Sequence, residues 1–78
     1  MRYDVSYYTD DSRYDSLLCR ATYKSDAEVL QASIEKARYY NQVLPQFKKH
    51  PITHITIYRL ARTKGDSYWK TIIDHLAI

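Results

Sequence analysis

The chain has 78 residues, and its twelve Lys and Arg outnumber its nine Asp and Glu, which gives a formal net charge of +3. A chain of this length has room for one small hydrophobic core, so we expect a single domain over residues 1–78. One glycine excludes the glycine-rich phosphate-binding loops. One cysteine, Cys19, excludes an internal disulfide and favours a reducing compartment such as the cytoplasm. No apolar run approaches the roughly 18 residues that cross a bilayer, so neither a membrane span nor a signal peptide is expected.

The first predicted strand covers residues 2–9, where Tyr and Val alternate with more polar side chains. Residues 10–15 are polar turn formers that close a hairpin to a second strand at residues 16–24. We expect the odd-numbered residues of the second strand to face the core: Leu17, Cys19, Ala21 and Tyr23. Leu18 and Arg20 then fall on the opposite face of the sheet.

A helix is predicted from about residue 26 to about residue 43, ending near Pro45. Ser25 and Glu28 have the spacing of a capping box, in which each side chain accepts a hydrogen bond from the other residue's backbone amide. The apolar residues that recur at helical spacing are Ala27, Leu30, Ile34, Ala37 and Leu44, flanked by Val29 and Tyr40. Residues 45–51 connect this helix back to the sheet.

A third strand is predicted at residues 52–62, where apolar groups in both phases fit a strand inside the sheet. A tight turn at Lys64-Gly65-Asp66 then leads to the last segment, residues 67–78. We interpret that segment as a fourth strand, because an aromatic start and β-branched residues favour one, and we expect Ile57 and Trp69 near the core. The alternative is a helix, since Tyr68, Trp69, Ile72, Ile73 and Leu76 also fit a helical stripe.

These elements predict an α+β two-layer sandwich of the order β-β-α-β-β, with a four-stranded, mostly antiparallel sheet and one amphipathic helix. A helical last segment would change the order to β-β-α-β-α. One helix covers one face of the sheet, so the other face is left for water, a partner or a second copy of the chain. The residues expected on that uncovered face are Tyr8, Leu18, Arg20, Tyr58, Leu60 and Tyr68.

Residues that carry catalysis or bind metals are sparse. His50 and His54 are four residues apart, but Pro51 argues against a helix that would align them as zinc ligands. Cys19 is predicted to face the core, where cysteine side chains are usually inert. We therefore expect a protein that is not an enzyme and that needs no metal or other cofactor.

Nine tyrosines and a local excess of cations predict a contact surface. Residues 27–78 hold eight basic residues against four acidic ones, and Tyr, Trp and Arg are the residue types most enriched at interface hot spots. The candidate binding residues are Tyr8, Arg20, Tyr58, Arg59, Arg62, Lys64, Tyr68 and Trp69. Strand alternation divides the cations between the two faces of the sheet, which favours a mixed patch over one continuous basic stripe.

Two functions fit such a patch. The first is a protein-binding module whose partner is a protein, either acidic or part of a nucleic-acid-handling complex. In length and in its lack of site motifs, the chain resembles small accessory proteins of bacteriophages and mobile elements, such as anti-CRISPR inhibitors, although it shares no residue motif with them. The second is a nucleic-acid-binding module, in which Arg59, Arg62, Lys64 and Lys70 contact phosphates while neighbouring rings stack on bases. A homodimer through the uncovered face is a further alternative.

Overall fold

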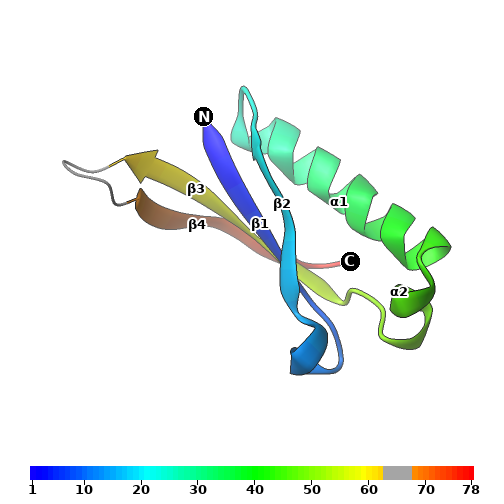
Figure 1. The fold of residues 1–78 in the computed structure, drawn as a ribbon. Helices are drawn as coiled ribbons and strands as arrows, with labels where there is room; N and C mark the ends of the chain where they lie inside the picture. Colours follow the sequence, from blue (N-terminus) through cyan, green and yellow to red (C-terminus); the bar gives the residue numbers. More distant parts are fainter. Residues whose placement is uncertain (63–67) are drawn as a thin grey trace.

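The computed structural model describes residues 1–62 and 68–78, so the predicted turn at Lys64-Gly65-Asp66 lies outside the described residues. The fold is α+β (Figure 1). Its elements, in chain order, are β1 (Arg2–Tyr8), a 3-10 turn η1 (Ser12–Tyr14), β2 (Ser16–Thr22), α1 (Asp26–Val43), α2 (Pro45–Lys49), β3 (His54–Arg62) and β4 (Tyr68–Ala77). The last segment is a strand, which confirms the predicted β-β-α-β-β order over its helical alternative.

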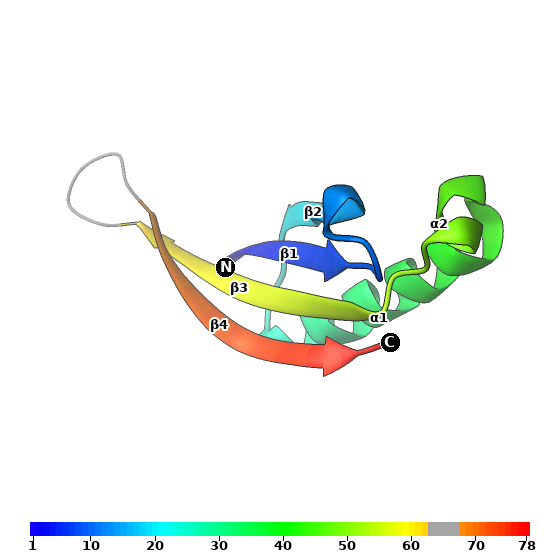
Figure 2. The same cartoon turned by 90° about the horizontal axis from the view of Figure 1, so that it is seen from below.

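The four strands form one sheet in the order β2-β1-β3-β4, and each neighbouring pair is antiparallel. β1 and β3 are therefore the central strands, while β2 and β4 form the two edges. The main helix, α1, lies across one side of this sheet, as Figure 2 shows from below. Both layers of the predicted sandwich are thus present, and among residues 1–62 and 68–78 no helix lies on the other side of the sheet.

The buried core lies between the sheet and α1. Small or branched side chains of α1 meet large ones from the central strands, while Phe47 of α2 packs on Tyr7 and Tyr40 and closes one end of the core. The buried apolar residues are Tyr3, Val5, Leu18, Val29, Ala37, Phe47, Ile52, Ile55 and Ile57. In the described part of the chain, no helix is both long and apolar enough to cross a membrane.

The predicted alternation of β2 is wrong at its first two apolar residues. Leu18 is 7% exposed and belongs to the core, whereas Leu17 is 45% exposed. Val5 pairs with Cys19 but Ser6 pairs with Leu17, so Leu18 is an extra residue opposite the β1 strand. Such a β-bulge shifts the two-residue period, so strict alternation cannot be right on both sides of it. Cys19 and Tyr23, on the far side of the bulge, pack against the core as predicted.

The predicted helix begins and ends where its sequence signals indicated, but the stripe that faces the sheet is only partly the predicted one. Val29, Ser33 and Ala37 are its buried residues, whereas Leu30 and Ile34 are only partly buried. Serine and alanine are small, so they allow the helix backbone to lie close to the large side chains of the central strands. The larger apolar residues of the helix are consequently displaced to the side of this contact.

Half of the predicted capping box is present. The Ser25 hydroxyl accepts a hydrogen bond from the Glu28 amide at 3.2 Å, as expected. The Glu28 carboxylate accepts from the Lys24 amide at 3.3 Å rather than from the amide of Ser25. Each of these hydrogen bonds gives a side-chain acceptor to a backbone amide at the start of α1 or just before it. The acidic residues of the first turn also interact favourably with the positive end of the helix dipole.

Replacing Ser25 by alanine is expected to lower the free energy of unfolding by about 1 kcal/mol, because the Glu28 amide loses its side-chain acceptor. Urea unfolding followed by circular dichroism measures the loss. Ser16→Ala, at an exposed position of β2, is the matched control, and its expected change is below about 0.5 kcal/mol. Equal losses in the two variants would contradict a capping role for Ser25.

Candidate binding face

The side of the sheet turned away from α1, which we call the open face, carries three rows of described side chains that each run across all four strands. The pairing registers place one residue of each strand in each row. The central row consists of Arg20, Asp4, Tyr58 and Ile72. On one side of it lie Thr22, Arg2, Leu60 and Lys70, and on the other lie Leu17, Ser6, Thr56 and His75.

A buried carboxylate anchors the centre of the open face. Asp4 is 1% exposed, and Arg20 binds it with two hydrogen bonds, from Nε to Oδ1 at 2.6 Å and from Nη2 to Oδ2 at 2.9 Å. The Lys70 ammonium lies 3.5 Å from the same Oδ2. The hydrogen bonds from Arg20 hold the pKa of Asp4 below its ordinary value, and they outweigh the burial that would raise it.

A small pocket of about 140 Å³ opens around this carboxylate. Its lining residues come from all four strands: Arg2, Asp4, Arg20, Leu60 and Lys70. Three of these side chains are cationic and one is anionic, so the lining residues carry a net excess of two positive charges. The buried carboxylate of Asp4 attracts these cations, and it thereby holds side chains close together that would otherwise repel one another.

The aromatic rings of the open face are engaged with their neighbours. The Lys70 ammonium lies 5.3 Å from the centre of the Tyr58 ring, in a cation–π contact. A hydrogen bond with Tyr8, together with burial, raises the pKa of Tyr58. The Tyr8 ring meets His75 edge-on with a centroid distance of 5.7 Å, and His75 in turn stacks on His54.

Among the described side chains of the open face, the most exposed apolar one belongs to Ile72. It lies at the end of the central row, on edge strand β4, and is 63% exposed. Its neighbour across the strand pair is Tyr58. An exposed isoleucine beside an aromatic ring and a lysine is the kind of mixed surface that protein interfaces use.

Three of the predicted binding residues, Tyr8, Arg20 and Tyr58, share the open face. Arg59 faces the other side of the sheet, where its guanidinium donates to the carboxylate of Asp26 at the start of α1. Tyr3 donates to the same carboxylate at 2.6 Å, and these hydrogen bonds lower the pKa of Asp26. Arg59 therefore connects the helix to the sheet and does not belong to the open face.

The expectation that Trp69 lies near the core is wrong. Its partner across the strand pair is Ala61, and its side chain is 69% exposed. Figure 1 shows that the far ends of β3 and β4 extend beyond α1, so neither helix of the described part of the chain covers them. Arg62 and Tyr68 pair with each other at the end of the hairpin, and their side chains, like all of Lys64, lie outside the described part.

Alternation along single strands does not connect the residues at the centre of this face. It places Asp4 and Lys70 on separate strands without pairing them, and it gives Arg2 and Ile72 no role in binding. Polar residues in the outward phase of the first strand were the available signal, but only the strand order brings β1, β2 and β4 together around one carboxylate.

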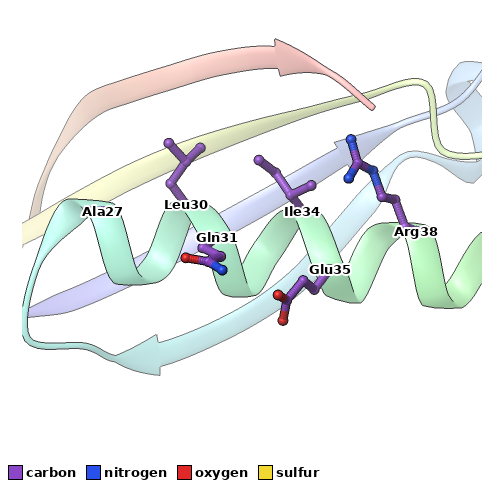
Figure 3. A pocket seen from close by; sticks show the side chains of 6 residues that line it. All are labelled: Ala27, Leu30, Gln31, Ile34, Glu35 and Arg38. Carbon is purple, nitrogen blue, oxygen red and sulfur yellow. The ribbon is translucent and has the colours of Figure 1, made fainter.

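A second hollow, of about 400 Å³, lies along α1. Figure 3 shows Leu30 and Ile34 on one side of the helix, with Arg38 beside them and Gln31 and Glu35 lower down. All of its lining residues come from α1, and they combine apolar groups with one acid and one base. It is the larger hollow, but no convergent set of charges defines a ligand for it, so the open face is the better candidate site.

The Cys19 side chain is partly buried, and burial raises the pKa of its thiol. Within residues 1–62 and 68–78, no three His, Cys, Asp or Glu side chains come together as ligands for a metal ion.

Comparisons of the chain with protein-family models, curated proteins and solved structures gave no match.

Proposed function

We propose that this protein is a non-catalytic protein-binding module that docks an acidic region of a partner protein onto its open face. The observation that carries this proposal is the central cluster, where Arg20 and Lys70 converge on the buried Asp4 next to the exposed Ile72. Arginine and tyrosine around an apolar contact are typical of interface hot spots, and a net positive surface complements an acidic one.

Nucleic acid is the second candidate partner, because the same cations would attract phosphates. Binding to single strands uses aromatic ring faces on which bases stack, and it uses cations spread along the path of the backbone. On the open face, Lys70 covers one side of the Tyr58 ring, while Arg59 lies on the opposite side of the sheet. These contacts favour a protein partner over a strand of nucleic acid.

A second copy of the chain fits the open face less well than an acidic partner protein does. A symmetric dimer through this face would bring the same patch of each copy together, and the cations Arg2, Arg20 and Lys70 of one copy would then lie close to those of the other. Like charges brought together in this way cost several kcal/mol.

Within the protein-binding class, we propose a small inhibitor or adaptor, the role that the chain's length and lack of site motifs suggested.

The test is an affinity capture with three immobilised forms of the protein: wild type, Ile72→Asp and Gln31→Asp. Both substitutions add one acid at an exposed position, the first on the open face and the second on the outer surface of α1. We expect the wild type and Gln31→Asp to retain the same partner protein after nuclease treatment, and Ile72→Asp to lose it. Mass spectrometry and gel densitometry measure the retained protein.

Two results would contradict this proposal. One is equal retention by all three forms, because the partner would then not use the open face. The other is a captured species that nuclease releases and that shows a steep dependence on salt, which would favour the nucleic-acid alternative.

A further inference from the structure

The pocket around Asp4 has the size and charge to hold one small anionic group. Its volume is about 140 Å³, roughly that of four or five water molecules in the liquid, which is enough for a carboxylate and a short stem. Its walls carry two more positive charges than negative ones. Leu60 contributes an apolar wall on which methylene groups can rest.

At least two of the three cations that line this pocket are held in place by contacts with other described side chains. Arg20 is fixed by its two hydrogen bonds to Asp4, and Lys70 is held between that carboxylate and the Tyr58 ring. Ordering a long side chain on binding costs about 0.5–1.5 kcal/mol in ordinary interfaces, and this arrangement removes much of that cost. A pocket ordered in this way favours a ligand whose charge matches the cluster.

We propose that this pocket receives a single Asp or Glu side chain of the partner protein, whose apolar neighbour rests on Ile72. This inference rests on the proposed function and specifies the contact that gives it specificity. An incoming carboxylate reduces the excess positive charge among the lining residues, and the adjoining 63% exposed isoleucine offers an apolar contact that an acidic peptide segment can fill.

The surroundings favour a carboxylate over the phosphate of a nucleic acid. A phosphate backbone needs cations repeated along its path, but the row beyond the central one contains Leu17, Ser6, Thr56 and His75, with no lysine or arginine. The cationic cluster of the described open face is therefore local and has an apolar residue at its edge. A single acidic side chain next to an apolar one matches that pattern.

The test titrates the isotope-labelled full chain with an acetylated, amidated peptide of six glutamates at roughly 0.15 M salt, where long-range attraction is screened. The matched probes are six glutamines, inorganic phosphate and a six-residue oligothymidylate. Two-dimensional NMR follows the Arg20 Nε–H signal and the backbone amides of Asp4 and Lys70. We expect the glutamate peptide alone to produce saturable shifts at these positions.

Two variants test the lining residues without removing the Asp4–Arg20 pair. Lys70→Met and Arg2→Met are each expected to weaken glutamate-peptide binding roughly 2- to 5-fold, as for a partly exposed ion pair. Arg38→Met, at an exposed position of α1, is the control and is expected to leave the affinity unchanged. An equal loss in the control would overturn the proposed site, because the attraction would then come from overall charge.

The inference is also overturned if the glutamate peptide shifts none of these signals, or if phosphate or oligothymidylate shifts them more strongly. Its failure differs from failure of the proposed function. If Ile72→Asp still abolishes capture of a partner protein while glutamate does not bind the pocket, the docking face stands and the carboxylate contact falls. If glutamate binds but Ile72→Asp retains the partner, the pocket stands and the docking proposal falls.

Discussion

Ile57→Ala is expected to lower the free energy of unfolding by about 3 kcal/mol, whereas Ile72→Ala is expected to change it by less than about 0.5 kcal/mol. The two isoleucines lie on the paired strands β3 and β4 but in different environments. Ile57 is fully buried against the helix side, and Ile72 is mostly exposed on the open face. Truncating the first leaves a cavity in a core that has few other residues, while truncating the second exposes little new surface.

Urea unfolding of both variants and the wild type measures this difference. A domain of this size is stabilised by roughly 4–12 kcal/mol in total, so the expected loss at Ile57 is a large fraction of it. Similar losses at the two positions would contradict the assignment of the two faces of the sheet. The small effect at Ile72 also means that a binding defect in an Ile72 variant reports on the surface rather than on unfolding.

Arg20→Met is expected to lower the free energy of unfolding by about 2 kcal/mol at neutral pH. Removing one partner of a buried ion pair costs about 3–5 kcal/mol, but Arg20 is half exposed and Lys70 remains near Asp4, so solvent and the second cation reduce the loss. Methionine preserves much of the length of the side chain, which isolates the contribution of the charge. Arg38→Met, at an exposed position of α1, is the control and is expected to have little effect.

The same pair predicts how stability depends on pH. Because hydrogen bonds from Arg20 lower the pKa of Asp4 in the folded protein, its contribution is present above the ordinary pKa of aspartate, about 3.9. That contribution is lost as the pH falls through the lower pKa of the folded state. We therefore expect the stability difference between wild type and Asp4→Asn to be largest near neutral pH and to shrink below about pH 4.

Urea unfolding of both proteins across this pH range measures the difference. A stability gap that stays constant from neutral pH to well below the ordinary aspartate pKa would contradict the ionised Asp4–Arg20 pair. A gap that widens on acidification would contradict it as well, because the sign of the shift in pKa would then be opposite.

Local signals in the sequence predicted the four strands and the main helix of this fold, but not the short helix α2, because residues 45–51 were expected only to connect α1 to the sheet. The Ser25 cap and Pro45 marked the ends of α1, and the aromatic and β-branched residues after position 67 indicated a strand. The errors occurred where a long-range feature overrides a local pattern. A bulge in the pairing of β1 with β2 moved Leu18 into the core, and the limited reach of α1 left Trp69 exposed.

The candidate site was predicted only in part, for a related reason. Alternation along single strands placed Tyr8, Arg20 and Tyr58 on one face, and the pairing confirms that placement. The cluster at Asp4 depends on the order of the strands, since its cations come from residues 16 and 66 positions further along the chain. Periodicity within one segment carries no information about which strands become neighbours.

The most direct test of the docking face is site-specific photo-crosslinking in a cell lysate. A photoreactive phenylalanine analogue replaces Ile72 on the open face in one protein and Gln31 on the outer surface of α1 in the other. We expect the probe at Ile72 to give one dominant adduct that protease removes and nuclease does not, and the probe at Gln31 to give none. Adducts of equal yield from both positions, or nuclease-sensitive adducts from Ile72, would contradict docking of a protein on the open face.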